Sequence, residues 1–366
     1  MISLPPALES AIAQALRALP PSQWQAAARH LSQRYRQAED ERRKTKDEQH
    51  PSAAHARSIR NLKSKIQYSD ALGYAGFVLP AAYAQLWGAM RATRMRASAF
   101  HPTTMLDLGS GPGTALWTAV EHFPFLTSIH AYEREPAFIS LGKILAQSSP
   151  HPAVRKTHWR QITLTGPLPL DPPTIQNSEL RIQNSKFDLI VIAHALNEMD
   201  PATRDAVVLS AWDHCSGLLL IVEPGTSAAF PVVLRARELL LSQGAYTIAP
   251  CAHNMPCPLP TAAPNDWCHF PQRLQRPQFQ RIAKEATAGW EEAKFSYAGM
   301  ARFAPDSPIW GRLLHQPQQT KIGVDLTVSA ADATIHHPHI PKRNRPLHKA
   351  ASDLHWGDTL DTPIEP

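Results

Sequence analysis

The sequence predicts an α/β protein whose core is a doubly wound, mostly parallel β-sheet. From residue 103 onward, short apolar segments alternate with longer segments of helical periodicity, which is typical of β–α–β units. A glycine-rich loop directly follows the first apolar segment, where doubly wound sheets bind nucleotide-like ligands. Together these observations predict a Rossmann-like domain at residues 101–250.

Four apolar segments are expected to form strands of that sheet: residues 105–108, 128–132, 187–192 and 217–222. A weaker candidate strand covers residues 321–327. Two other segments are expected to be irregular. One contains the repeated Ile-Gln-Asn-Ser at residues 175–178 and 182–185, which we interpret as a duplicated insertion in a surface loop. The other is the tail at residues 336–346, which is rich in His, Pro and basic residues.

Residues 1–100 are expected to form a helical N-terminal region. Apolar residues recur at helical spacing between Leu8 and Leu19, and Pro20 ends that helix. A second helix is expected from about Trp24, and a third at about residues 80–95. The charged residues 29–65 are interpreted as a solvated helix face or a linker, with an RNA contact as the alternative.

The composition is that of a soluble globular protein. Of 366 residues, 43% are apolar and 19% charged, so one core of about 200 residues with smaller flanking parts is expected. The net charge of +6 mildly favours a polyanionic partner such as RNA. At the N-terminus no basic flank leads into a long apolar run, and no apolar stretch in the sequence reaches membrane-spanning length. We therefore expect a cytoplasmic protein without membrane contact.

The glycine-rich loop predicts a cofactor site. It reads Gly109-Ser110-Gly111-Pro112-Gly113, and glycines allow a tight turn and a close approach of the backbone to a ligand. The spacing differs from the G-x-G-x-x-G loop that binds the pyrophosphate of dinucleotides. The alternative is a purely structural turn.

Two acidic residues make this loop more specific. Asp107 would repel pyrophosphate but can hold the ammonium group of S-adenosylmethionine, and Glu133, at the end of the second expected strand, can bind ribose hydroxyls. The sequence therefore predicts a class I S-adenosylmethionine-dependent methyltransferase fold. Its cofactor residues would be Asp107, Gly109, Gly111, Gly113, Glu133 and His194.

His194 and Asn197 follow the third expected strand, beside the predicted cofactor site. Either is a candidate catalytic residue, and His194 would be a general base if its pKa stays near 6.5. The equally weighted alternative is that both residues only order the turn after the strand.

The predicted C-terminal extension, residues 251–366, contains Cys251, Cys257 and Cys268 among prolines and histidines. Three such thiols suit a metal or an iron–sulfur cluster in a reducing compartment better than a disulfide framework. Their spacing is not that of a common zinc ribbon, and three unpaired cysteines are the alternative. Cys215 is expected to be a core residue.

In the order of several motifs, the sequence resembles the methyltransferase-like assembly factors of the small ribosomal subunit. The segments that carry this resemblance are residues 106–114 with Trp117, 194–198, 223–226, 251–268 and 356–358. The resemblance implies S-adenosylmethionine binding and association with the small ribosomal subunit and its RNA. Methyl transfer is not implied for the mitochondrial members. It also implies a [4Fe-4S] cluster on four cysteines, three of which match Cys251, Cys257 and Cys268.

The fourth cluster ligand of that family has no matching cysteine here. Thr327 stands near the expected position, and a histidine such as His253 or His269 is a conceivable substitute.

The leading hypothesis is an S-adenosylmethionine-binding protein that assists small-subunit assembly. The alternatives are an active methyltransferase on ribosomal RNA or protein, and a small-molecule methyltransferase without a ribosomal partner. A basic tail patch of Lys342, Arg343 and Arg345 could contact phosphate, although solvated surface is the default interpretation.

Overall fold

The computed structural model describes residues 1–30, 33, 66–168 and 186–364. The repeated tetrapeptide and nearly all of the charged segment at residues 29–65 lie outside these ranges. Within the described residues, no helix is both long enough and apolar enough to cross a membrane.

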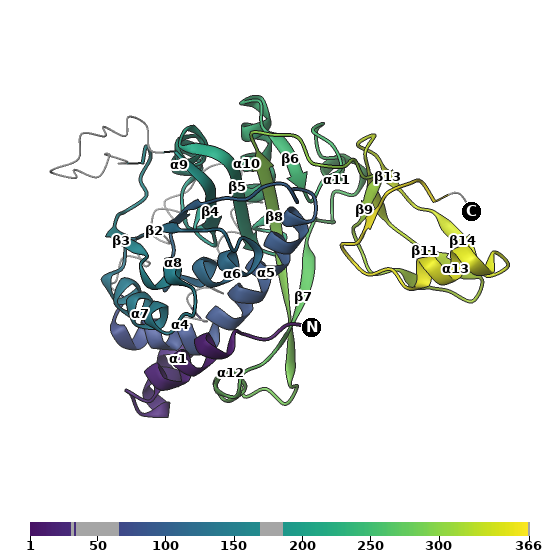
Figure 1. Cartoon of the computed structure of the whole chain (residues 1–366). Coiled ribbons are helices and arrows are strands. Elements are labelled where there is room, and N and C mark those ends of the chain that lie inside the picture. The colour runs from purple at the N-terminus through teal and green to yellow at the C-terminus, as the bar shows by residue number, and fades with distance from the viewer. Residues whose placement is uncertain (31–32, 34–65, 169–185, 365–366) are drawn as a thin grey trace.

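The core is a single sheet in which β7 pairs with β8 and the other strands run in the order β3-β2-β1-β4-β5-β8-β6. The strands are β1 Thr104–Leu108, β2 Ser128–Glu133, β3 His158–Gln161, β4 Phe187–Ala193, β5 Cys215–Pro224, β6 Tyr246–Ala249, β7 Phe270–Gln275 and β8 Trp290–Ala301. Strands β1 to β5 are parallel, whereas β8 is antiparallel to both β5 and β6. This order is that of class I methyltransferases, so the predicted fold class and all four predicted strands of the sheet are confirmed (Figure 1).

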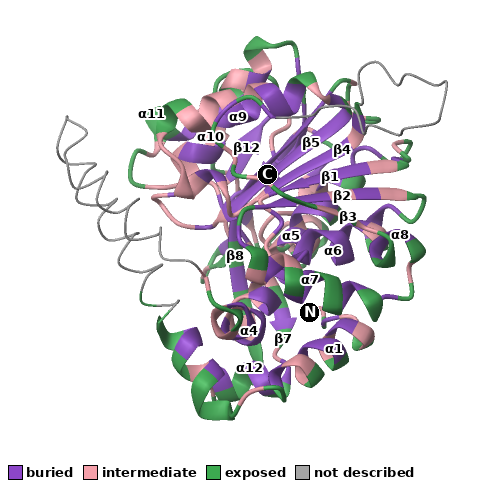
Figure 2. Cartoon of the chain, turned by 90° about the vertical axis from the view of Figure 1, so that its left-hand side faces the viewer, coloured by how far each residue is buried: buried purple, intermediate pink, exposed green. Residues whose placement is uncertain are grey.

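Helices cover both faces of the sheet, which is why its central strands β1, β4 and β5 are almost entirely buried and mostly apolar. Within β5, Leu218, Leu220 and Val222 belong to one core and Leu219 and Ile221 to the other. The alternation follows from the two-residue period of a strand. Figure 2 shows the buried strands between the helical layers.

The first core is covered by helices from two parts of the chain. The N-terminal region contributes α1 Pro6–Leu16, a helical stretch at residues 21–30, α4 Tyr68–Phe77 and α5 Leu79–Arg94, and the chain after β1 contributes α6 Thr114–His122, α7 Pro136–Gln147 and the short α8 Pro152–Arg155. The second core lies under α9 Pro201–Asp213 and α10 Phe230–Ser242. The three predicted N-terminal helices are confirmed, and α4 was not predicted.

The sheet continues beyond residue 250, where the sequence analysis placed the start of the C-terminal extension. Strand β8 pairs with β5 from Leu218 opposite Ala301 to Pro224 opposite Phe295. Strand β7 pairs with β8, and Ile2 forms a bridge to Leu274 in β7. The short helices α11 Leu259–Ala262 and α12 Gln278–Ala283 lie in the connections before and after β7.

The chain ends in a small β module beside this sheet (Figure 1). One of its sheets contains β9 Gly311–Leu313, β12 Val328–Ala330, β13 Ile335–His336 and β15 Thr359–Leu360; the other contains β10 Gln318–Gln319, β11 Gly323–Asp325 and β14 His339–Pro341. Helix α13, Arg345–Ser352, packs on β11 and β14. The module has its own core, in which Val324 of β11 faces Ile340 of β14.

The prediction that residues 336–346 are irregular is therefore wrong. Strand β14 lies in this segment, and its residue Ile340 is fully buried. Strands of two or three residues are too short to show an alternation of apolar and polar residues. They form because distant segments of the chain pair with one another, which the local sequence does not indicate. Of the candidate strand at residues 321–327, only Gly323–Asp325 is extended as a strand.

Candidate cofactor site and three-cysteine cavity

The loop after β1 requires its glycines. Gly109, Gly111 and Gly113 have φ values of 74°, 52° and 84°, a region that side chains with a Cβ rarely adopt. At Gly109, a Cβ would also lie 2.8 Å from the Cβ of Ala195. The loop thus turns sharply and leads into the first turn of α6, whose free N–H groups begin there.

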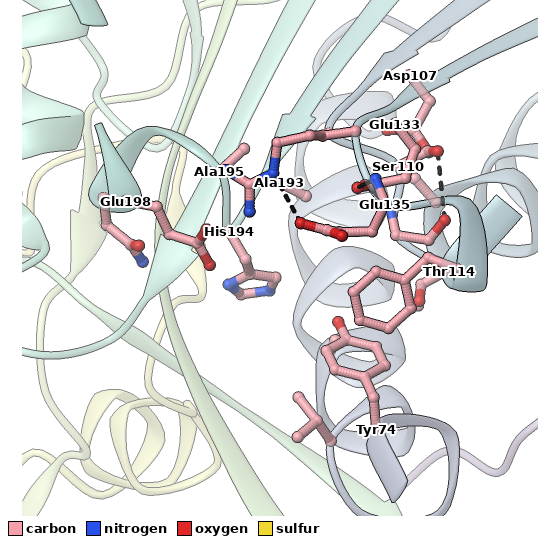
Figure 3. A pocket seen from close by; sticks show the side chains of 18 of the residues that line it. Tyr74, Asp107, Ser110, Thr114, Glu133, Glu135, Ala193, His194, Ala195 and Glu198 are labelled. Carbon is pink, nitrogen blue, oxygen red and sulfur yellow. Dashed lines mark hydrogen bonds and ion pairs between the residues drawn. The ribbon is translucent and has the colours of Figure 1, made fainter. Parts of the chain in front are cut away.

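A cavity of about 390 Å³ lies against this loop, at the carboxyl ends of β1, β2, β4 and β5 (Figure 3). Cavities of this size typically hold small molecules. Of the predicted site residues, those that line it are Asp107, Gly109, Gly111, Glu133, His194 and Asn197. Gly113 shapes the turn, where its N–H donates to the carbonyl of Ser110 at 2.8 Å.

Asp107 is a buried carboxyl group poised for a cation. Its side chain is 1% exposed, and Oδ2 has no hydrogen-bond partner among the described residues. Burial, and then the neighbouring Glu133, raise the pKa of Asp107 to about 8. An unpartnered buried carboxyl is costly, so the site fits a ligand that brings an ammonium group.

Glu133 joins the ends of β1 and β2. Its Oε2 accepts a hydrogen bond from Gly111 N at 2.8 Å, and its Oε1 accepts one from Glu135 N at 2.8 Å. Burial raises the pKa of Glu133 although these hydrogen bonds lower it. Each carboxylate oxygen can accept a second hydrogen bond, which leaves Glu133 able to bind hydroxyl groups in the cavity.

His194 has a different electrostatic state from the one predicted. It has a positive φ of 56°, and its Nε2 is buried without a partner in the described part of the chain. Burial lowers the pKa of His194 to about 4, so the imidazole is neutral at physiological pH. The expectation of a pKa near 6.5 is wrong, and a base this weak is poorly matched to proton removal at neutral pH.

Asn197 lies on a turn that a buried carboxyl group holds in place. Glu223 Oε1 accepts hydrogen bonds from Leu196 N at 2.9 Å and from Asn197 N at 3.3 Å. Glu223 is fully buried, and this burial raises its pKa to about 8. The side chain that orders this turn is thus Glu223, which acts through backbone N–H groups, and Asn197 lines the cavity.

Two aromatic and two acidic side chains are among the lining residues that the sequence analysis did not assign to the site. Tyr74 of α4 and Phe138 of α7 meet edge to face with ring centroids 5.1 Å apart. Glu135 and Glu198 add two carboxyl groups to the lining. No local pattern marks Tyr74 or Phe138, because tertiary packing brings α4 and α7 to this edge of the sheet. Glu198 belongs to residues 194–198, a segment that the sequence analysis used for the family resemblance without giving Glu198 a role.

The three predicted metal ligands converge on a second, smaller cavity. Cys251, Cys257 and Cys268 line it together with other residues that include Arg237 and Arg312. Ser329 of β12 also lines it, whereas Thr327, His253 and His269 do not. Cys215 is buried in the core under α9 and α10, as predicted.

This second cavity combines buried thiols with buried guanidinium groups. Burial, followed by repulsion from Cys251, raises the pKa of Cys257 to about 11, and burial, followed by repulsion from Cys251 and Cys257, raises the pKa of Cys268 well above its ordinary value. Arg237 donates from Nη2 to the carbonyls of His253 and Met255, while its Nε and Nη1 have no partner among the described atoms. In the described ranges, no group of three or more His, Cys, Asp or Glu side chains is arranged to hold a metal ion.

Strand order, glycine loop and buried acids define a methyltransferase-like protein of class I. The chain belongs to the family described as mitochondrial small ribosomal subunit Rsm22, whose model matches residues 68–361.

Two curated relatives are similar over most of this chain. The human ribosome assembly protein METTL17, mitochondrial, is 28% identical over 362 residues, which cover 93% of this chain and 74% of that protein. The Rsm22-cox11 tandem protein 2, mitochondrial, of Schizosaccharomyces pombe is 24% identical over 80% of this chain. The chain spans 43% of that tandem protein.

Among solved structures, magnesium protoporphyrin IX methyltransferase from Synechocystis with bound S-adenosylmethionine aligns with 72% of this chain and 97% of its own. Its sequence identity is 9% and its TM-score 0.35. A likeness this distant has no bearing on function.

We expect Asp107→Asn to stabilise the protein increasingly as the pH rises. The pKa of Asp107 is about 8 in the folded protein and about 3.9 in an unfolded chain. The folded state therefore holds the proton more tightly, and the buried carboxyl costs more stability as the pH rises from 4 through 8. The gain in melting temperature of the variant over wild type should grow between pH 5 and pH 9.

Asp188→Asn is the matched control. Asp188 accepts hydrogen bonds from Thr103 N and Thr104 N, which lower its pKa. This variant should be less stable than wild type throughout the same pH range. A stability gain of Asp107→Asn that stays constant or shrinks with pH would contradict the assigned state of Asp107.

Proposed function

We propose that this protein binds S-adenosylmethionine in the larger cavity and acts on the small ribosomal subunit during its assembly. The observation that supports cofactor binding is the buried carboxyl group of Asp107, which lies beside the glycine loop. Its Oδ2 atom has no hydrogen-bond partner among the described residues. Asp107 would hold the ammonium group and Glu133 the ribose hydroxyls. Gly109 and Gly111 would let the backbone approach the ligand.

The ribosomal role is supported by family membership and by the name of the human relative, a ribosome assembly protein. We further propose direct contact with ribosomal RNA, for which the net charge of +6 is favourable. The exposed Lys342, Arg343 and Arg345 are candidates for phosphate contacts. The relatives are mitochondrial, and a cytoplasmic location stays a prediction from the sequence.

An active methyltransferase on ribosomal RNA, protein or a small molecule is the second candidate. His194 and Asn197 favour it, because both line the cavity at the end of β4, where a methyl acceptor would approach. The Nε2 atom of the neutral His194 imidazole has no protein partner among the described residues, so it would be available for a hydrogen bond with the methyl acceptor.

We also propose that Cys251, Cys257 and Cys268 hold an iron–sulfur cluster, for which [4Fe-4S] is the candidate. Such a cluster would supply a covalent cross-link within the Cys segment, and its thiolates would bring negative charge. The buried guanidinium group of Arg237 supports a negatively charged cluster in this cavity, because two of its nitrogens have no partner in the described chain. Ser329, which lines the cavity, replaces Thr327 as the candidate for a fourth ligand.

The ribosomal proposal predicts co-sedimentation with small subunits. Purified protein mixed with separated subunits at one salt concentration should migrate with the small and not the large subunit in a density gradient. Incubation with tritiated S-adenosylmethionine should leave only background counts in small-subunit RNA and protein. Counts that Asp107→Asn abolishes would favour the active methyltransferase, and sedimentation with neither subunit would reject the ribosomal role.

The cluster proposal predicts brown protein after anaerobic purification, with about four irons per chain. Cys257→Ser should lose the colour and the iron because one of the three thiolate ligands is gone. Cys215→Ala is the matched control, since Cys215 lies in a different core, and it should keep both. Colourless, iron-free wild-type protein would reject the cluster and leave the cysteines as structural or zinc-binding residues.

A further inference from the structure

The smaller cavity, which contains the three cysteines, has a cationic lining. The guanidinium groups of Arg237 and Arg312 line it, and its described lining includes neither an Asp nor a Glu side chain. Both arginines are deeply buried: Arg237 is 3% exposed and Arg312 is 5% exposed. Burial of a charge without a counter-charge is strongly unfavourable. The cavity therefore favours an occupant with net negative charge.

Arg237 of α10 has more donors than its protein contacts use. Its Nη2 donates to the carbonyls of His253 and Met255 at 2.8 and 3.0 Å. Its Nε and Nη1 are buried without a partner among the described atoms. Holding two carbonyls requires N–H donors but no charge, so a neutral amide side chain could do the same. The contacts to the backbone therefore leave the positive charge of Arg237 unexplained.

Two more buried arginines hold the same segment of the chain. Arg312 of β9 donates from Nε to the carbonyl of Pro250 at 2.6 Å. Arg96, which follows α5 and is 3% exposed, donates from Nη1 to the carbonyls of Ile248 and Cys251 at 2.8 Å each. Burial, and then the charge of Arg312, lower the pKa of Arg96 to about 10. Three separate parts of the chain thus bring positive charge to one loop.

These arginines find no acidic partner in the described part of the chain. The ion pairs among the described residues include neither Arg96, Arg237 nor Arg312. The cysteines can supply the missing negative charge, because a cysteine that binds a metal does so as a thiolate. A cluster with its thiolate ligands is an anion overall, and its reduction potential depends on nearby charges and hydrogen bonds.

We propose that Arg237 and Arg312 are the counter-charges of the proposed cluster. They are positioning residues that supply no ligand, stabilise the assembled anionic centre relative to the empty cavity, and raise its reduction potential. This inference rests on the proposed cluster. Reduction adds a negative charge to the centre, so nearby cations favour the reduced form. At an effective dielectric constant of about 20, a charge about 10 Å away changes such an equilibrium by about tenfold.

A redox titration of the anaerobically purified full chain tests the proposal. The absorbance of the cluster is followed while dithionite lowers the potential in the presence of mediators. Arg237→Gln removes the charge but keeps an amide donor. Its reduction equilibrium should shift about tenfold toward the oxidised form, which for one electron is about 59 mV in midpoint potential. Arg312→Gln should shift it in the same direction, and Arg237→Lys, which keeps the charge, should stay closer to wild type.

Arg235→Gln is the matched control. Arg235 lies on the same helix as Arg237, but it is exposed and pairs with Asp205 of α9 at 2.7 Å. It is also outside the lining of the smaller cavity. This variant should keep the wild-type midpoint potential.

Unfolding in urea adds a readout that includes the metal-free chain. Each variant is compared with itself, loaded and after removal of iron by a chelator, so a general loss of stability cancels. Loading should raise the urea midpoint of wild type. Arg237→Gln should reduce this gain, because the loaded form loses a counter-charge while the empty cavity loses a buried cation. A residue that only held the backbone carbonyls would affect both forms alike.

Two results would overturn the proposal. One is an Arg237→Gln variant with the wild-type midpoint potential and an undiminished gain on loading. The other is an Arg237→Lys variant that matches Arg237→Gln in both measurements, which would assign the role to the hydrogen bonds of the guanidinium group and not to its charge. Colourless, iron-free wild-type protein would instead reject the proposed cluster itself, and with it this inference.

Discussion

The buried carboxyl group of Glu133 is the constraint on which the larger cavity depends. It accepts hydrogen bonds from Gly111 N and Glu135 N and so fastens the glycine loop after β1 to the end of β2. The carbonyl of Tyr132 in β2 also accepts hydrogen bonds from Gly109 N and Ser110 N of the loop. The three left-handed glycines make that geometry possible. Because the loop is held in this way, the Asp107 carboxyl stays buried at the switch point of the sheet, where it destabilises the protein until a cation arrives.

The elements that the sequence predicts well are those whose signal is local. The central parallel strands β1, β4 and β5 are mostly apolar and buried, and the glycine loop follows β1 directly, so the sequence alone places Asp107, Gly109, Gly111 and Glu133 near one another, and all four line the cavity. Other contributions could not be. Tyr74 reaches the cavity only because α4 packs beside α7. The short strands of the C-terminal module exist through pairing between distant segments such as Val324 and Ile340.

Burial also changed the chemistry assigned to residues that were located correctly. His194 lies where the sequence analysis placed it, but its surroundings remove the water that would stabilise an imidazolium. Likewise, Cys251, Cys257 and Cys268 lie within one short segment of the sequence, whereas Ser329 joins them in the cavity through β12, more than fifty residues further along the chain. Sequence thus indicates which residues matter more readily than their protonation state or their distant neighbours.

The position of β7 and β8 in the sheet has a consequence for how the protein can evolve. The chain leaves the sheet at Ala249, passes through the cysteine segment and returns at Phe270, and Ile2 bridges to Leu274 on the returning strand. The methyltransferase core and the cysteine segment are therefore interlaced along the polypeptide rather than joined end to end. Loss of the chain after Ala249 would remove β7 and β8 from the sheet together with the cysteine segment, so truncation cannot separate the two during evolution.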